Sequence, residues 1–311
     1  MRLSVVVVNW NSRDDLESCL ASLEAQTHRD LETIVIDNGS TDGSIEMVRR
    51  RFPHFLLVEA GENLGFAEGC NRGIALATGE WVAMLNNDAV AEPDWAQRLV
   101  EAAERAPARC GMLQSAMFFL DRPDTINSLG LYVTRSGGAI DRHEGEPREE
   151  AITNDCAIFC PTGGAAAYRR TMLEAIKLPV GYFDREHFMY AEDFDLGWRA
   201  QLAGWSAELV SSSKVLHKFH GSTVRRGRAW FVVMTRMNRL RTLLKNASPR
   251  FLLRTTLYSA WEIGELLWHG GWRAGVDLPK AVMQSLRQRA NVDRMATASR
   301  REVEERWVDA R

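Results

Sequence analysis

Residues 3–44 read LSVVVVNWNSRDDLESCLASLEAQTHRDLETIVIDNGSTDGS, and their pattern decides the fold class. Two runs of β-branched and aliphatic residues, 3–8 and 31–36, flank a segment whose apolar residues recur at helical spacing. Both runs are apolar on each face, as strands covered by helices on both sides are. Ser12, followed three residues later by Asp15, predicts a capping box at the start of the intervening helix. Strand, helix and strand in this order predict a parallel βαβ unit.

The same alternation continues along the next part of the chain. We expect further strands at 55–58 and 81–85, with crossover helices over 43–51 and 66–77. Residues 120–150 are rich in Gly, Pro and charge, and we expect a loop or hairpin region there. The predicted architecture is α/β, with an open, mostly parallel central sheet flanked by helices.

Charge is distributed unevenly along the 311 residues. Residues 225–311 contain 18 Lys and Arg against 8 Asp and Glu, whereas residues 1–224 contain 21 against 33. The acidic first part argues against a nucleic-acid partner, and the basic, aromatic-rich second part suits an anionic membrane surface. The periodicity of the second part equally fits a dimer interface, a cover for the core or a solvated helical face.

Cysteine usage and hydropathy indicate the compartment. The five cysteines are odd in number and form no CxxC pair, so neither a disulfide framework nor a zinc ribbon is indicated. No run approaches the roughly 20 apolar residues of a membrane-spanning helix. The apolar run 5–8 is too short for the core of a signal peptide. We therefore expect a cytoplasmic protein whose contact with the inner face of a membrane is at most peripheral.

Polar residues follow every predicted strand of the first half. In parallel α/β sheets ligands bind outside the carboxyl ends of the strands, so these residues are the candidates for nucleotide-sugar binding. They are Asn9, Asp37, Asn38, Asn63, Asn86, Asn87 and Asp88. The glycine-containing turn after Asp37 allows close backbone approach to a phosphate. No Gly-Lys-Ser/Thr follows it and no GxGxxG follows the first strand, which argues against a P-loop and a dinucleotide-binding oxidoreductase.

Three further positions are candidates for chemistry. Asp88 ends a buried strand and suits a divalent cation that would neutralise a diphosphate, although a simple turn is as consistent with its spacing. Glu192, Asp193 and Asp195 lie in the first turn of a predicted helix, where acids complement the helix dipole and one can act as a general base. His217 could join a carboxylate on a metal.

The order and spacing of these segments resemble family 2 of the inverting glycosyltransferases, which have the GT-A fold, and especially its bacterial rhamnosyltransferase-like branch. The resemblance covers about residues 3–245. It is carried by VVVVNWNSRDDLESCLASLEAQ (5–26), IVIDNGSTDGS (34–44), ENLGFAEGCNRGIALATGEWVAMLNNDAV (62–90), PTGGAAAYRR (161–170), FMYAEDFDLGWRAQLAG (188–204) and VLHKFHGST (215–223).

The resemblance implies a division of the chain. A GT-A catalytic domain would span 1–224, with a nucleotide-sugar half over about 1–118 and an acceptor half over about 119–224. A helical, basic extension would follow over 225–311, and this extension is the candidate for membrane association.

The resemblance also implies roles for single residues. Asp37 is similar to the residue that contacts the base of a uridine or thymidine diphosphate sugar, with Asn9 and Asn63 lining the same cleft. Asp193 is similar to the catalytic base, which deprotonates the acceptor hydroxyl. Glu192 either orients the acceptor or caps the helix.

The family's metal-binding DxD motif reads Asn86-Asn87-Asp88 in this chain. Its first acid is missing, so the resemblance implies a Mg or Mn ion held by Asp88 and His217, with nearby His220 as a competing ligand. Asn86 keeps the ability to hydrogen-bond a ribose.

The implied function is transfer of a sugar, rhamnose by analogy, from a dTDP- or UDP-sugar to a hydroxyl of a cell-surface glycan or lipid-linked acceptor. One alternative is a catalytically silent scaffold that binds nucleotide sugars. Another is a sugar-1-phosphate nucleotidyltransferase, which would need a glycine-rich basic loop after the first strand, and residues 9–13 contain no glycine. A homodimer is compatible with the sequence.

Overall fold

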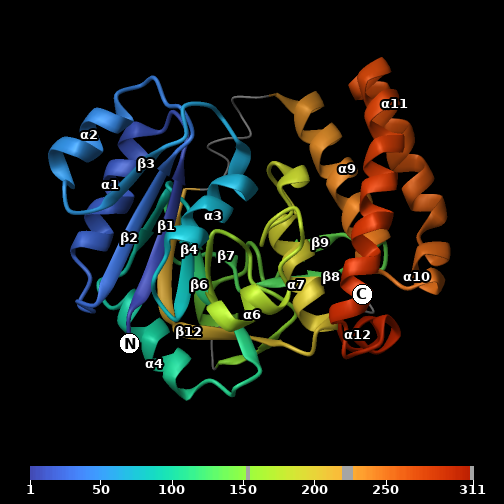
Figure 1. Ribbon diagram of the computed structural model, residues 1–311. Coiled ribbons are helices and arrows are strands. Elements are labelled where there is room, and N and C mark those ends of the chain that lie inside the picture. Colours follow the sequence, from blue (N-terminus) through green and yellow to red (C-terminus); the bar gives the residue numbers. More distant parts are fainter. Residues whose placement is uncertain (152–154, 219–226, 309–311) are drawn as a thin grey trace.

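A computed structural model describes residues 1–151, 155–218 and 227–308 (Figure 1). The first part of the chain alternates strands and helices as predicted, which confirms the α/β class. Its elements are β1 (Leu3–Asn9), α1 (Arg13–Glu24), β2 (Leu31–Asp37), α2 (Ser44–Arg51), β3 (Leu56–Glu59), α3 (Gly65–Leu76) and β4 (Trp81–Leu85).

These four strands form a parallel half-sheet in the order β3-β2-β1-β4. β1 pairs with β2 and β4, and β2 pairs with β3, all in parallel. The register places Asn9 opposite Asp37 and Asp37 opposite Glu59. The polar residues that end the strands therefore meet at one edge of the sheet.

The second half adds strands that run mainly antiparallel to their neighbours. The elements are β5 (Ala89–Ala91), α4 (Trp95–Arg105), β6 (Cys110–Phe119), β7 (Ile126–Ser128), β8 (Leu131–Val133), β9 (Ala139–Asp141), α5 (Arg148–Ala151), β10 (Cys156–Ile158), β11 (Ala165–Arg169), α6 (Arg170–Ala175), the 3₁₀-helix η1 (Arg185–His187), α7 (Glu192–Leu202) and β12 (Ser206–His217).

Insertion of β11 between β4 and β6 makes the sheet mixed. The principal strand order is β10-β12-β6-β11-β4-β1-β2-β3, with β5 beside β12 and β7 beside β6. β11 is antiparallel to β4, and Ala165 lies opposite Leu85. The turn that precedes β11 therefore borders the end of β4. The short hairpin β8–β9 lies within the loop or hairpin region predicted for 120–150.

Alternate residues of β1 belong to the two cores on opposite faces of the sheet. Val5 and Val7 pack with residues of α1, α2 and α4, whereas Val6 and Val8 pack with residues of α3 and α7. A strand buried on both faces has no polar side, which explains the unbroken apolar run in the sequence.

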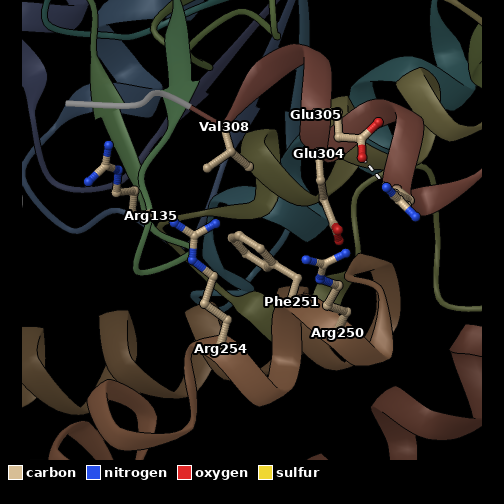
Figure 2. A pocket seen from close by; sticks show the side chains of 8 residues that line it. Arg135, Arg250, Phe251, Arg254, Glu304, Glu305 and Val308 are labelled. Carbon is tan, nitrogen blue, oxygen red and sulfur yellow. Dashed lines mark hydrogen bonds and ion pairs between the residues drawn. The ribbon is translucent and has the colours of Figure 1, made fainter.

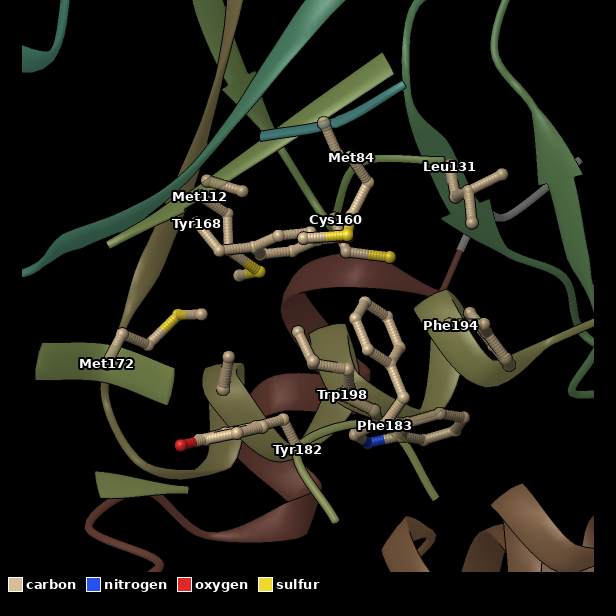
Figure 3. Close-up of a cluster of buried hydrophobic side chains, with 14 of the residues drawn as sticks. Met84, Met112, Leu131, Cys160, Tyr168, Met172, Tyr182, Phe183, Phe194 and Trp198 are labelled. Atoms are coloured by element: carbon tan, nitrogen blue, oxygen red, sulfur yellow. The ribbon is translucent and has the colours of Figure 1, made fainter. Parts of the chain in front are cut away.

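The face that carries α7 is filled by aromatic and sulfur-containing side chains (Figure 3). The rings of Phe194 and Trp198 lie 5.4 Å apart, and those of Tyr168 and Phe183 lie 5.8 Å apart, both edge to face. Truncating a buried aromatic side chain to Ala costs about 3–5 kcal/mol. This packing fixes α7, whose first turn carries the candidate catalytic acids.

Helix α3 lies unusually close to β1. A Cβ atom added at Gly73 would lie 2.2 Å from Cγ1 of Val6, and one added at Gly69 would lie 2.7 Å from Cγ1 of Val8. Only glycine permits this approach, and it positions the start of α3 beside the strand ends.

The predicted capping box is wrong. Ser12 occupies the N-cap position of α1 but makes no side-chain cap hydrogen bond. Its hydroxyl instead donates to the Asp15 carboxylate at 3.1 Å. Aspartate is one methylene shorter than the Glu or Gln of a capping box, so it does not reach back to the backbone of the cap.

The remaining helices complete the core of the α/β part. They are α9 (Arg228–Asn246), α10 (Pro249–Arg254), α11 (Thr256–Met295) and α12 (Arg300–Trp307). Leu243, Phe251, Val292 and Val303 belong to the same buried cluster as residues of β1 and α7. Within the described ranges, the search for a helix with the length and hydropathy to cross a membrane finds none.

Candidate active site

Asn9 links the ends of three strands. Its side chain is fully buried, and its Nδ2 donates to Asp37 Oδ2 at 3.0 Å. Its Oδ1 accepts a hydrogen bond from Asn87 Nδ2 at 2.8 Å. The structure therefore brings together three of the residues predicted at the strand ends, and Asn9 holds the other two in place.

Asp37 and Asn38 shape the turn after β2. Asp37 is almost fully buried, and its Oδ1 accepts a hydrogen bond from the backbone N–H of Ser40 at 2.7 Å. Asn38 is also buried, and its Nδ2 donates to the Gly65 carbonyl at 3.0 Å. Asn63 Oδ1 accepts from the Gly65 N–H at 3.0 Å. Contact of these residues with a nucleotide stays a prediction.

Gly65 joins the strand ends to the segment before α7. Its φ of +84° lies in the left-handed region, and an added Cβ would lie 2.6 Å from the Phe188 ring. The N–H of Ala67 donates to the Phe188 carbonyl at 3.2 Å. The start of α3 and residues 187–191 therefore form one wall.

Asp88 and His217 lie together at the ends of β4 and β12. Asp88 Oδ1 is 3.1 Å from His217 Nε2, and Asn86 Nδ2 lies 3.2 Å from the same nitrogen. The other ring nitrogen, Nδ1, is 2.8 Å from the side-chain oxygen of Asn127. That oxygen can only accept, so Nδ1 carries a proton and the ring is held with Nε2 facing Asp88.

The electrostatics of the pair keep Asp88 ionised. Burial opposes its charge, but the hydrogen bond and charge from His217 hold the pKa of the carboxyl below its usual value. A carboxylate oxygen suits Mg or Mn, and an imidazole nitrogen beside it favours a transition metal such as Mn. Among the described residues no group of three or more His, Cys, Asp or Glu could hold a metal. The competing ligand His220 and the predicted boundary at 224 lie outside the described residues.

Asp193 is held at the start of α7 by two backbone N–H groups. Gly163 donates to Oδ2 and Phe194 donates to Oδ1, each at 2.7 Å. Burial raises the pKa of Asp193, and these hydrogen bonds act in the opposite direction. An acid whose pKa moves toward neutrality suits general base catalysis.

The turn 161–164 connects this acid to the Asp88 side of the site. Gly163 donates to Asp193, and the carbonyl of the next residue, Gly164, accepts from the N–H of Asn86 at 3.0 Å. The candidate base and the candidate metal ligands therefore lie on either side of one turn. These residues open one of the segments that carry the family resemblance, but the resemblance assigned them no role.

Glu192 differs from its neighbour in its charge. It is 5% exposed, and its Oε2 has no hydrogen-bond partner among the described residues. Burial and the adjacent Asp193 charge raise the pKa of Glu192 to about 8, so it is protonated at neutral pH. The N-cap of α7 is Ala191. A role for Glu192 in orienting an acceptor stays a prediction.

Asp195, the third acid of this turn, belongs to a buried ion-pair network. Its Oδ2 accepts from Arg199 Nε at 3.1 Å, and its Oδ1 pairs with Lys245 at 2.9 Å. Lys245 also pairs with Asp184. Asp195 is thus a structural residue that ties α7 to α9.

Sequence reasoning missed three residues at the site. Asn127 orients His217, and it lies in a region that spacing alone marked only as loop or hairpin. Asp141, on β9, lies within electrostatic range of Asp193 and His217, and burial raises its pKa to about 7. Asn238, on α9, acts on the backbone of the segment before α7.

Asn238 holds a strained segment that leads into α7. Its Nδ2 donates to the carbonyls of His187, Met189 and Tyr190 at 2.8–2.9 Å. Phe188, Tyr190 and Ala191 all have φ between +60° and +73°. Positive φ in non-glycine residues is costly and persists where surrounding structure enforces it. No sequence signal connects an asparagine on α9 to this segment.

Comparison with known proteins identifies the family of this chain. The family model described as glycosyl transferase family 2 matches residues 4–177. An N-acetylglucosaminyl-diphospho-decaprenol L-rhamnosyltransferase of Mycobacterium tuberculosis is 31% identical over 253 residues, which cover 72% of this chain and 78% of the relative.

Solved structures agree with the fold. The crystal structure of GalNAc-T7 with UDP, GalNAc and Mn2+ superposes with a TM-score of 0.71 at 16% identity, covering 98% of this chain and 56% of that one. The mannosyltransferase PcManGT of Pyrobaculum calidifontis, in complex with GDP-Man and Mn2+, gives 0.54 at 18% identity, covering 98% and 87%. These likenesses confirm the predicted GT-A fold. Because the family model spans more than half of the sequence and the mycobacterial relative aligns over most of both chains, this protein belongs to glycosyl transferase family 2.

Proposed function

We propose that the protein is a metal-dependent, inverting glycosyltransferase that moves a sugar from a dTDP- or UDP-sugar to a hydroxyl of a lipid-linked glycan. The observation that supports this most is the turn 161–164, which contacts Asp193 through Gly163 and the Asp88 side of the site through Gly164. A base and a cation-binding pair are thereby brought to one substrate.

Binding of the nucleotide-sugar donor is assigned to the polar residues at the strand ends within residues 1–118. Asn9, Asp37, Asn38 and Asn63 would form the wall that receives the nucleotide, and Asn86 and Asn87 would lie near the ribose. Asp88 and His217 would hold Mg or Mn. A bound divalent cation neutralises the negative charge that develops on the departing diphosphate.

Asp193 carries out the proton transfer in this proposal. Its carboxylate accepts the proton of the acceptor hydroxyl, and the hydroxyl oxygen forms a bond to the anomeric carbon. The bond from that carbon to the diphosphate oxygen breaks, and its electron pair leaves with the nucleoside diphosphate. One displacement from the opposite face inverts the configuration. Two backbone N–H groups keep Asp193 oriented throughout, and protonated Glu192 adds no second negative charge.

The acceptor half is assigned to residues 119–224. The mycobacterial relative is named for transfer of L-rhamnose to N-acetylglucosaminyl-diphospho-decaprenol, which supports rhamnose as the sugar and a polyprenyl diphosphate glycan as the acceptor. Such an acceptor would place the enzyme on the cytoplasmic side of a membrane, in cell-wall or polysaccharide biosynthesis.

A donor panel tests this function. Release of nucleoside diphosphate is measured with dTDP-, UDP- and GDP-sugars, with and without Mg or Mn, and with a polyprenyl diphosphate N-acetylglucosamine acceptor. We expect metal- and acceptor-dependent release, fastest with dTDP-rhamnose, and a product of inverted configuration by NMR. Donor binding without release from any sugar would contradict a transferase and favour a silent scaffold.

A further inference from the structure

Helix α11 folds back on itself. Gly271 has φ +57° and ψ −148°, which interrupts the helix and separates residues 256–270 from residues 272–295. Arg239 of α9 donates a hydrogen bond to the Ser259 hydroxyl on the first limb at 3.3 Å. Arg289 on the second limb donates to the Leu244 carbonyl of α9 at 2.9 Å. Both limbs therefore pack on α9, and we call them the helical hairpin.

The tip of the hairpin lies at the same end of the molecule as the active site. A Cβ added at Gly270 would lie 3.2 Å from Val233, near the start of α9. Trp230, on the first turn of α9, packs against Phe188 and Tyr190, which precede the catalytic acids. Figure 1 shows the upper end of α11 and the carboxyl ends of β1–β3 at the top of the molecule.

The side of the hairpin that faces away from α9 is apolar and exposed. Trp268 at the tip is 85% exposed and Trp272 is 76% exposed. This outer face consists of Leu257, Trp261, Trp268, Trp272 and Val276. Leu257, Trp261 and Trp268 recur at helical spacing on one side of the first limb, and exposed large apolar side chains gathered in this way mark an interaction site.

The charges around the outer face are almost all positive. The exposed charged residues between 250 and 290 are Arg250, Arg254, Arg273, Lys280, Arg287 and a single acid, Asp277. The glutamates of the hairpin, Glu262 and Glu265, pair with Arg236 against α9. A partner that fits the outer face therefore has both an apolar region and negatively charged groups.

A recess lined by arginines lies beside the foot of the hairpin (Figure 2). Arg135, Arg250 and Arg254 line it, and none of the three has a hydrogen-bond or ion-pair partner within the described parts of the chain. The two acids of the recess are already engaged, since Glu304 accepts from Ser248 and Glu305 accepts from Arg301. The recess suits a phosphate group.

We infer that the outer face of the helical hairpin docks on the surface of an anionic bilayer, with Trp268 and Trp272 at the interface and the arginine recess on lipid phosphates. Tryptophan favours the boundary between lipid headgroups and acyl chains, and basic residues beside an apolar helix face add attraction to anionic lipids. A second copy of the chain suits this surface less well, because an isologous dimer would bring two positive faces together. Docking is a property of this surface and does not depend on the proposed catalysis.

The 311-residue protein is tested by flotation with phosphatidylcholine vesicles, with and without phosphatidylglycerol. We expect flotation with the anionic vesicles and its loss at high salt. Trp268→Ser combined with Trp272→Ser, and Arg250→Glu combined with Arg254→Glu, should each weaken partitioning at least about tenfold. All four residues are exposed, so the fold should persist.

Matched controls come from the other side of the molecule. Leu56→Ser with Leu76→Ser removes exposed apolar residues, and Arg29→Glu with Arg50→Glu reverses exposed charges. Both pairs should float like the unaltered protein. Donor binding, measured on the same samples, shows that each variant is folded and separates failure of docking from failure of the proposed function.

The proposal is overturned if the protein floats no better with anionic than with neutral vesicles, or if the tryptophan pair floats unchanged. It is also overturned if sedimentation shows a dimer that the tryptophan substitutions dissolve while no vesicle binding occurs. In that case a second copy covers the outer face.

Discussion

The imidazole of His217 is oriented by Asn127, which bonds the ring nitrogen that faces away from Asp88. Asn127 Oδ1 fixes the proton on Nδ1 and thereby turns Nε2 toward Asp88. Residues that orient metal-binding histidines in this way typically change metal affinity 10–100-fold when mutated.

Asn127→Ala should therefore weaken cation affinity about 10- to 100-fold, measured as the Mn concentration that half-saturates donor binding. Saturating Mn should restore most of the binding. Asn71→Ala is the matched control, because it removes another buried amide, which bonds the backbone of Phe183, and should leave the Mn requirement unchanged. An unaltered Mn requirement in Asn127→Ala would separate Asn127 from the cation site.

Glu192 predicts a pH dependence of stability. Its pKa in the folded protein is about 8, whereas an unfolded glutamate titrates near about 4.3. Between these values the folded state binds more protons than the unfolded state, so the free energy of unfolding falls as pH rises. Glu192→Gln should remove this loss and gain stability relative to the unaltered protein between pH 5 and about 8.

Thermal unfolding from acidic to alkaline pH measures the effect of Glu192→Gln. The difference in Tm between variant and unaltered protein should grow with pH, in the variant's favour. Glu46→Gln, an exposed glutamate on α2, should show a constant difference. Parallel curves for Glu192→Gln would show that the carboxyl is ionised in the folded protein.

At the scale of elements, residues 187–191 depend on α9 for their conformation. Asn238 supplies hydrogen bonds to three carbonyls of this segment, and three of its residues have positive φ. The segment contacts Gly65 on one side and leads into Asp193 on the other. The helical extension is therefore connected through this segment to the candidate catalytic acids.

Asn238→Ala should release this strain locally. We expect turnover to fall about tenfold or more, because misplacement of a catalytic group by about 1 Å costs up to 100-fold. Amide exchange over 187–194 should become faster while that of β1 is unchanged. Asn291→Ala, on the second limb of α11, is the control and should change neither. Unchanged exchange in Asn238→Ala would show that the segment holds its own shape.

Elements with a local signal were predictable. The apolar runs of β1, β2 and β4 and the stripe of α1 follow from periodicity, and the ends of β1 and β2 place Asn9 beside Asp37 through parallel register. Insertion of β11 between β4 and β6 was not predictable, because it rests on pairing between residues about 50 to 90 positions apart. The roles of Asn127 and Asn238 depend on the same long-range contacts.

At the scale of the whole molecule, a buried ion pair joins the extension to the catalytic part. Lys245 of α9 is fully buried and pairs with Asp184 and Asp195. The sequence pattern marked the extension as basic and helical, but it could not distinguish a solvated lysine from one inserted into the core. Helices α9, α10 and α11 also add apolar residues to the core, which likewise shows that the extension is packed into the molecule.

Lys245→Met should destabilise the protein by about 3–5 kcal/mol, because buried Asp184 and Asp195 both lose the lysine, although Arg199 still pairs with Asp195. The measurement is the free energy of unfolding in urea. Lys280→Met removes an exposed lysine on α11 and should change it by less than about 0.5 kcal/mol. Equal effects of the two substitutions would show that the extension is not anchored through Lys245.

The proposed transferase mechanism is tested most directly by Asp193→Asn, with donor affinity and turnover measured on the same preparation. Gly163 and Phe194 donate to different carboxylate oxygens, so the amide oxygen keeps only one of these two hydrogen bonds, and donor affinity on the same preparation checks that the site persists. We predict a fall in turnover of about 100- to 10,000-fold with donor affinity nearly unchanged. Asp124→Asn, an exposed acid, should leave both unchanged. Turnover that survives in Asp193→Asn would contradict the assignment of Asp193 as the base.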